Sequence, residues 1–254
     1  MKLREIYHNV DAVAPFSLSD EYCAKYGAYD NSGIIIDCGE EILRVLFSLD
    51  CSPSAVAQAK KIGANLIVSH HPAIYEPLKR LEADSAVLQA AKAGISVLSA
   101  HLNLDVAEGG VDDSLVQALG GNVEEVMHPL SCGGYGKAVS VQTTVQKLKE
   151  RVQKTLSTQR VLVYGEDRPI KKIASFCGAG MDGDAIAFAM RVGAEAIVTS
   201  DGKHHHVAQA LDSGLNVVLL THYASENYGF FRFYQKIKEK LTVPCEYFTD
   251  GRLL

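Results

Sequence analysis

The sequence lacks several patterns that would assign a protein to a class directly. Its six cysteines form no C-x-x-C pair, which favours reduced, mostly buried thiols in a cytoplasmic protein. No stretch is apolar enough to span a membrane, and the charged first 15 residues do not resemble a signal peptide. Neither a G-x-S-x-G elbow nor a Walker loop is present. The cysteines stand at positions 23, 38, 51, 132, 177 and 245.

Positive charge is also scarce. The net charge is −5, which argues against a protein that coats nucleic acid through a generally basic surface. The chain has 254 residues, of which 47% are hydrophobic and 22% charged, as in ordinary soluble globular proteins. This length allows one large domain or two lobes with a substantial core.

The local patterns alternate between short apolar runs and helical segments, which predicts an α/β fold with mainly parallel sheets. Ser52 and Gly63 are expected to bound one helix, Asp84 to cap another, and Asp112 or Asp113 to cap a third. Residues 128–140 look loose because they contain three glycines. Expected strands cover 34–36, 42–49, 64–68, 95–100, 137–141, 161–164 and 196–200, and expected helices cover 3–14, 53–63, 84–94, 112–119, 144–156 and 228–240.

A weak internal repeat divides the chain. Residues 185–198 resemble residues 55–68 at a constant offset of 130, with a glycine at the same place. One explanation is that all helix–glycine–strand units look alike. Duplication explains more, because each copy also continues into a strand and then a histidine with a carboxylate four positions later. We therefore expect two similar α/β lobes, 1–127 and 128–254, with a cleft between their strand ends, unless the lobes are intertwined into one structural unit.

Histidines and carboxylates gather where the predicted strands end. His70 and His71 follow one strand directly, and ligands of open α/β sheets lie at the carboxyl ends of strands. Imidazole with carboxylate suits Zn²⁺, Mn²⁺, Fe²⁺, Ni²⁺ or Co²⁺ better than Mg²⁺ or Ca²⁺. Adjacent histidines diverge in a regular strand, so two divalent metal ions per chain are expected. The other candidates, each following a predicted strand, are His101, Asp105, His222 and Glu226.

Several of these residues have a plainer interpretation. Asp105 and Glu226 could simply cap or flank helices, and His101 could support a ligand or contact substrate rather than bind metal. The histidine run 204–206 could be a metal-binding tract or simply a solvated turn and helix start. We interpret Lys203 and His205 there as anion or substrate contacts rather than ligands. Residues 178–183 fail the G-x-G-x-x-G pattern at the last position, so turn formation is the default there, and Cys177 has only its position to suggest a nucleophile.

Taken together, these stretches resemble the NGG-interacting-factor-three-like family, also known as the GTP cyclohydrolase I type 2 family. The resemblance implies a dinuclear metal site with ligands His70, His71, Asp105, His222 and Glu226, with His101 in the same pocket. It also implies a ring-shaped homohexamer and the short form of the family, without an inserted domain. The family usually has Trp where this chain has Tyr29, and Gly where it has Ser200. These differences affect the residues expected to contact substrate. The matching stretches are 29–33, 67–72, 100–105, 109–113, 177–180, 199–205 and 221–226.

Three functions follow from this combination. The first is a metal-dependent hydrolase of a nucleotide-like substrate, in which His101 or His205 moves a proton and Asn103 and Lys203 contact substrate. The GTP cyclohydrolase activity itself comes from the resemblance alone. The second is a non-catalytic metal-binding scaffold or regulatory partner. The third, nucleic-acid binding through a ring, is the least favoured because of the negative net charge.

Overall fold

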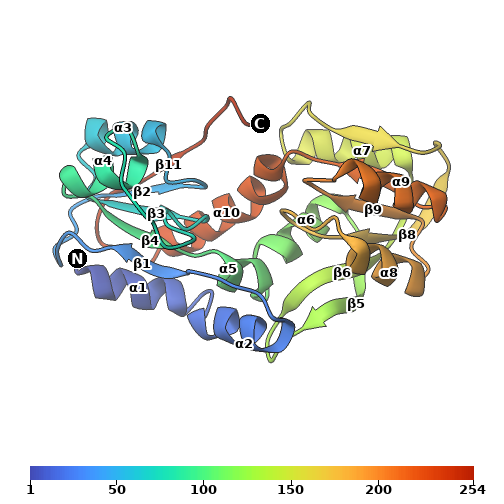
Figure 1. Ribbon diagram of the computed structural model, residues 1–254, viewed down its shortest axis with the longest axis horizontal. Coiled ribbons are helices and arrows are strands. Elements are labelled where there is room, and N and C mark those ends of the chain that lie inside the picture. Colours follow the sequence, from blue (N-terminus) through green and yellow to red (C-terminus); the bar gives the residue numbers. More distant parts are fainter. The chain divides into compact units, whose positions relative to one another are not determined.

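A computed structural model describes all 254 residues and shows two compact units (Figure 1). The first comprises Met1–Ala107 and Phe230–Thr249, and the second comprises Glu108–Gly229 and Asp250–Leu254. The boundary expected after residue 127 falls within strand β5 (Asn122–Pro129) of the second unit. A chain segment near the C-terminus returns to the first unit, which no local sequence pattern indicates.

The first unit contains a mainly parallel sheet of five strands in the order β1-β4-β3-β2-β11. Only β1 runs antiparallel to its neighbour. The strands are β1 (Gly33–Ile36), β2 (Val45–Ser48), β3 (Leu66–Ser69), β4 (Ser96–Ser99) and β11 (Cys245–Phe248). The helices are α1 (Leu3–Asp11), α2 (Phe16–Tyr26), α3 (Pro53–Ile62), α4 (Ala86–Lys92), α5 (Leu102–Val106) and the second half of α10 (His222–Lys238).

Both faces of this sheet are covered, which explains why its strands read as continuous apolar runs. Leu46 packs with Val56 and Ala59 of α3, on the face over which α3 and α4 lie (Figure 1). Its neighbour Phe47 points the opposite way and its ring lies 6.4 Å from those of Phe230 and Phe233 on α10. Alternate residues of one strand therefore build two separate apolar layers.

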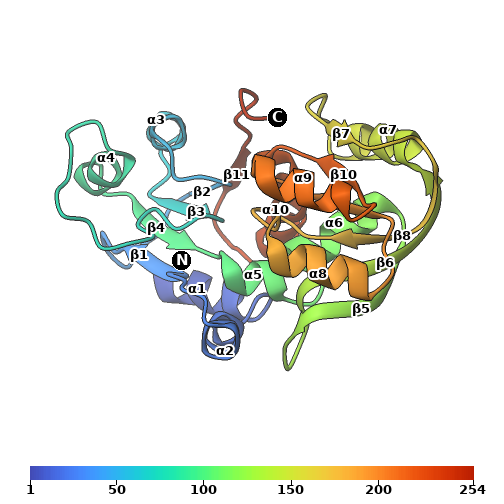
Figure 2. The same cartoon turned by 45° about the vertical axis from the view of Figure 1, so that its right-hand side comes forward.

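The second unit contains a mixed sheet of six strands in the order β5-β6-β8-β9-β10-β7. Its parallel part is limited to β8, β9 and β10, so the prediction of a mainly parallel sheet is wrong for this half. Helices α8 and α9 cover one face, and α6 and α7 pack against the sheet as well (Figure 2). The elements are α6 (Val111–Leu119), β5 (Asn122–Pro129), β6 (Gly134–Thr144), α7 (Val145–Thr155), β7 (Leu162–Tyr164), β8 (Pro169–Ser175), α8 (Gly183–Arg191), β9 (Ala196–Thr199), α9 (His204–Asp212) and β10 (Asn216–Leu219).

The β5–β6 hairpin replaces the loose segment that the sequence suggested at 128–140. Its glycines look like loop residues, yet Gly134 and Gly136 belong to β6 itself. At Gly136, φ is +72° and an added Cβ would lie 2.7 Å from the Phe176 ring. The glycine is therefore required by close packing and by the backbone conformation.

The internal repeat is visible in the topology of the two units. The order β2, α3, β3, α4, β4, α5 in the first unit matches β8, α8, β9, α9, β10, α10 in the second. In both units the middle strand pairs in parallel with strands on each side. His101 directly precedes α5, and His222 is the first residue of α10. The correspondence between the two units therefore extends to these predicted site residues.

Helix ends were predicted with mixed success. Ser52 Oγ accepts the Ala55 N–H, and Gly63 ends α3 with φ +72°, as expected. Ser85, one residue after Asp84, caps α4. Gly110 stands at the N-cap of α6, so the capping role expected for Asp112 or Asp113 is wrong. None of the helices combines the length and the apolar character needed to cross a lipid bilayer.

Asp112 instead forms a buried ion pair. Its Oδ2 lies 3.1 Å from Lys137 Nζ on β6 and accepts the Gly136 N–H, and its Oδ1 accepts the Cys177 N–H. Asp112 is fully buried and Lys137 is nearly so. Burial lowers the pKa of Lys137, but the charges of Asp112 and Asp113 outweigh burial and raise it. The pair fixes α6 against the sheet.

We predict that Lys137→Met lowers the free energy of unfolding by about 3–5 kcal/mol, because it leaves the Asp112 carboxylate buried without its cation. Lys172→Met is the control, since Lys172 pairs with Glu124 at 2.7 Å but both side chains are partly exposed. Its cost should not exceed about 1 kcal/mol. Urea denaturation of both variants measures the difference, and equal losses would contradict the structural role of the buried pair.

Candidate functional site

Three imidazoles gather at the ends of β3 and β4 in the first unit. The ring centroid of His70 lies 4.9 Å from that of His71 and 5.3 Å from that of His101. The strand ends at Ser69, and the N–H groups of His70 and His71 both donate to the Leu49 carbonyl. The divergence expected for neighbours in a regular strand does not arise, because these residues lie beyond it.

Each of these histidines is held through Nδ1. His70 Nδ1 lies 2.8 Å from the Ala100 carbonyl oxygen, and His71 Nδ1 lies 2.7 Å from Asp50 Oδ1. His101 Nδ1 lies 2.7 Å from Asp30 Oδ1. Because a carbonyl or carboxylate oxygen only accepts, Nδ1 carries the proton and Nε2 keeps its lone pair. Imidazoles that bind metals are oriented in the same way.

His70 also lies beside a carboxylate. Its Nε2 is 3.3 Å from Asp105 Oδ1, and both side chains are almost completely buried. With the proton on Nδ1, a lone pair and a carboxylate oxygen face each other at this distance. They repel unless a proton or a metal ion lies between them, so the donor set fits a cation.

Asp30 is the centre of a hydrogen-bond network that orients His101. Its side chain is 1% exposed, and its oxygens accept from His101 Nδ1, Ser19 Oγ and Ser32 Oγ. Burial raises the pKa of Asp30, but these hydrogen bonds outweigh burial and lower it to about 2. The carboxylate therefore stays ionised and holds the imidazole at neutral pH.

The second unit presents a comparable arrangement on α10. This helix begins at His222, six residues earlier than predicted, so His222 and Glu226 are one turn apart on the same face. His222 Nδ1 lies 2.6 Å from Asp201 Oδ2, and its Nε2 lies 3.0 Å from Glu226 Oε1. Burial lowers the pKa of His222, but the hydrogen bonds and charges of Glu226 and Asp201 raise it to about 9. Glu226 is buried within the helix and is not a cap.

The glycine-rich turn at 178–183 supports this carboxylate. Gly178 has φ +58°, and a Cβ on it would collide with Glu226 Oε1. The Gly178 N–H donates to Ser225 Oγ, and its carbonyl accepts from Ser200 Oγ. The turn thus brings backbone close to Glu226. Beside it, Cys177 is 2% exposed and its N–H is bound to Asp112.

The predicted substrate contacts lie in different settings. Lys203 is the exposed N-cap residue of α9, and His205 is exposed in the first turn of that helix. Asn103 is fully buried and its amide donates to the Ala14 carbonyl, so it links α5 to the connection between α1 and α2.

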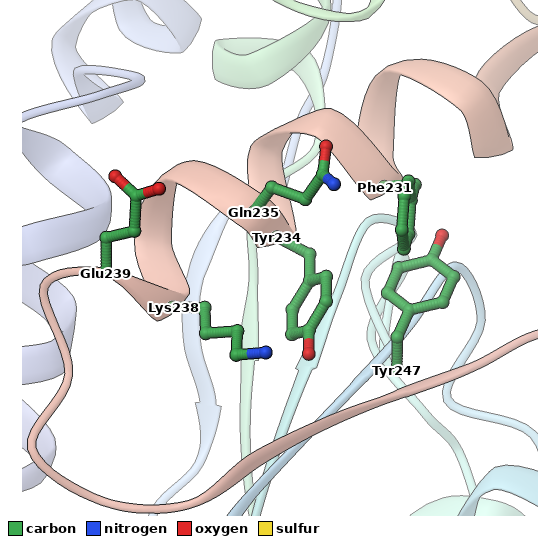
Figure 3. Close-up of a pocket in the computed structure, with 6 residues that line it drawn as sticks. All are labelled: Phe231, Tyr234, Gln235, Lys238, Glu239 and Tyr247. Atoms are coloured by element: carbon green, nitrogen blue, oxygen red, sulfur yellow. The ribbon is translucent and has the colours of Figure 1, made fainter.

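One pocket is lined by other residues than these. A cavity of about 540 Å³ lies between the second half of α10 and β11 (Figure 3). It is lined by Phe231, Tyr234, Gln235, Lys238, Glu239 and Tyr247. None of the predicted site residues lines it. Its aromatic side is formed by Phe231 and Tyr234 of α10, whose rings pack against Tyr247 of β11.

Comparison with known proteins decides the family. Residues 1–249 match the family model described as Duf34/NIF3 (NGG1p interacting factor 3). The chain belongs to this family. A relative from Clostridium perfringens, named GTP cyclohydrolase 1 type 2 homolog, is 31% identical over 97% of this chain and 95% of its own.

Two solved structures share the fold of this chain. A hypothetical protein of Staphylococcus aureus has a TM-score of 0.84 at 25% identity and covers 98% of this chain and 97% of its own. Reduced HcgD from Methanocaldococcus jannaschii has a TM-score of 0.83 at 25% identity, with 97% of both chains covered. The family resemblance predicted from the sequence motifs is confirmed. The predicted α/β fold is confirmed as well.

Sequence reasoning missed the carboxylates that hold the histidines. Asp50 and Asp201 each stand two residues beyond the end of a strand. An acidic residue at that position is the sequence signal that would have identified them. Asp30 precedes β1, and β1 is antiparallel to β4 with Gly33 opposite Ser99. The start of β1 therefore lies at the same edge as the end of β4, a register that the sequence does not reveal.

We predict that Asp30 makes the stability of the protein depend on pH in the acid range. Its pKa is 3.8 in the unfolded chain and about 2 in the folded one, so ionised Asp30 contributes about 2 kcal/mol above pH 4. This contribution is lost as the pH falls toward 2. Urea unfolding at pH 6 and pH 2.5 should show a larger loss in the wild type than in Asp30→Asn.

Asp84→Asn is the matched control, since Asp84 is an exposed carboxylate on a loop of the same unit. This variant should lose stability on acidification to the same extent as the wild type. If Asp30→Asn also behaved like the wild type, the network around Asp30 would not favour the ionised carboxylate.

Proposed function

We propose that this Duf34/NIF3 protein is a metal-dependent hydrolase of a nucleotide-like substrate that binds two divalent ions. The ligands are His70, His71, Asp105, His222 and Glu226. Within this set, the first unit supplies His70, His71 and Asp105, and the second unit supplies His222 and Glu226. The observation that carries the proposal is the anchoring of every candidate imidazole through Nδ1.

The chemistry of the ligands favours a borderline transition metal. Three imidazoles and two carboxylates suit Zn²⁺, Mn²⁺, Fe²⁺, Ni²⁺ or Co²⁺, whereas Mg²⁺ and Ca²⁺ prefer shells made of oxygen alone. His70 and Glu226 are almost completely buried, whereas His71 is about one-quarter exposed. Ions held by this set would supply Lewis-acid polarisation and a water of lowered pKa.

His101 is the residue best placed to move a proton. It stands beside His70 and His71, its Nδ1 proton is held by Asp30, and its side chain is 21% exposed. Its Nε2 can therefore accept a proton from a reacting group while Asp30 stabilises the resulting imidazolium. His205 is exposed and lacks a comparable anchor among its described contacts, so it is the weaker of the two predicted catalytic residues.

The choice of substrate rests on the relatives. Several carry the name GTP cyclohydrolase 1 type 2 homolog, which supports a screen that begins with GTP. Lys203 and Asn103 stay in the proposal as substrate contacts, Lys203 with more support because its ammonium is exposed. We also propose a cytoplasmic homo-oligomer, a ring-shaped hexamer, as the family resemblance implies.

Metal analysis of the purified protein tests the centre. We expect about two ions per chain in the wild type, by analogy with dinuclear hydrolases. His71→Ala and Glu226→Ala should each lose most of this metal, because each removes a ligand. His8→Ala removes an exposed histidine of α1 and should leave the metal content unchanged. Little metal in the wild type, or equal metal in all variants, would refute the ligand set.

His101→Gln separates catalysis from metal binding. The variant should keep its metal but hydrolyse the substrate about 10²–10⁴-fold more slowly, since it loses the proton acceptor. Ultraviolet absorbance of the purine ring follows the reaction with GTP. A metal-loaded wild type that leaves GTP and other nucleotides unchanged would favour the alternative function, a metal-binding scaffold or regulatory protein.

A further inference from the structure

Two tyrosines form an aromatic corner next to His101. The rings of Tyr29 and Tyr75 are 5.4 Å apart and meet at 86°, and the Tyr75 ring lies 5.9 Å from the His101 ring at 83°. Tyr29 is 54% exposed and Tyr75 is 43% exposed, the two highest values among the exposed aromatic residues. The corner is therefore open to solvent on one side and continuous with the histidine cluster on the other.

Hydrogen bonds fix the corner in place. The Tyr75 hydroxyl donates to the Tyr29 carbonyl at 2.7 Å, and the Asn31 amide donates to the Ile74 carbonyl at 2.6 Å. The loop after β3 is thereby joined to the segment before β1. Burial and the charge of Asp30 raise the pKa of Tyr75, so its hydroxyl remains a donor. A rigid arrangement of this kind loses little entropy when a ligand binds.

Folding alone does not account for this arrangement. Exposed aromatic rings gain little from the hydrophobic effect, and contiguous exposed apolar groups commonly mark binding sites. The connection from His70 to Ser85 is also long for a structureless loop, and such loops are usually functional. Anchoring two exposed rings beside a polar cluster is what a stacking surface requires.

We propose that Tyr29 and Tyr75 bind the planar heterocycle of the substrate, a purine-like ring, by stacking. One ring offers its face to the heterocycle while the other meets its edge, as in the preferred geometries of aromatic pairs. His101 then faces the heteroatoms of the stacked ring. This assignment rests on the proposed function in one respect, the position of the heterocycle beside the metal ligands. The two tyrosines themselves lie within the first unit.

The corner favours a flat ring over other ligands. The Tyr75 hydroxyl is already bonded to the Tyr29 carbonyl, so the ring faces are the principal surfaces that remain for a ligand. Phosphate groups require cationic donors, and neither tyrosine supplies one. A quaternary ammonium ion is bound by cages of several aromatic faces, whereas here the two tyrosine rings stand perpendicular to each other.

The absence of tryptophan from the chain allows a direct test. Tyr29→Trp places a single indole at the corner, and its fluorescence should be quenched by guanosine, which carries the ring without phosphate. Tripolyphosphate, which carries phosphate without a ring, should leave the signal unchanged. Tyr164→Trp, at an exposed tyrosine of the second unit, is the control and should respond to neither probe.

Binding of GTP to variants of Tyr75 provides the second measurement. Tyr75→Leu should weaken binding about tenfold or more, in line with the loss of one base–aromatic stack. Tyr75→Phe keeps the ring and loses only the hydroxyl bond to the Tyr29 carbonyl, so it should weaken binding less than Tyr75→Leu. Metal content is measured for each variant. Quenching by guanosine in metal-stripped protein would support the corner even if the metal centre failed its own test. Quenching by tripolyphosphate alone, or unchanged GTP binding by Tyr75→Leu, would overturn it.

Discussion

The fixed orientation of the imidazole rings is the constraint on which the candidate site depends. Four histidines of the candidate site have Nδ1 within 2.8 Å of a carbonyl or carboxylate oxygen, and this one contact sets the direction of each ring. Three of the four acceptors are aspartates, which also increase the basicity of Nε2. Without them the rings would rotate freely and the ligand set would lose its preorganisation.

The sheets explain how these acceptors reach the histidines. Asp50 and His71 follow β2 and β3, which are parallel neighbours with Ser48 opposite Ser69. Asp201 and His222 follow β9 and β10, which are paired in the same way. In both units an acidic residue beyond one strand therefore meets a histidine beyond the next, as the common edge of parallel strands dictates. Asp30 reaches the same edge because β1 is antiparallel.

The sequence predicts what is local and periodic. The segment from Ser52 through Gly63 to His71 was predicted with its cap, glycine and strand, since each depends on near neighbours. The candidate ligands were predicted from strand ends in the same way, and their ligand roles remain predictions. Two missed features depend on distant residues: the β5–β6 hairpin on the pairing of β6 with β8, and the role of Asp112 on Lys137. Such partners are set by tertiary packing, which propensity does not contain. The early start of α10 has a local cause, because the Thr221 hydroxyl accepts the Ala224 N–H.

The two copies of the repeat have also become unequal for a packing reason. The offset of 130 places Ser200 and Asp201 where the first copy has His70 and His71. Ser200 is fully buried, with its hydroxyl bonded to the Gly178 carbonyl, so an imidazole would not fit there. Asp201 anchors His222 in the role that Asp50 plays for His71. The second copy thus retains the strand-end arrangement but has one strand-end histidine, His222, with Glu226, while the first has three, His70, His71 and His101.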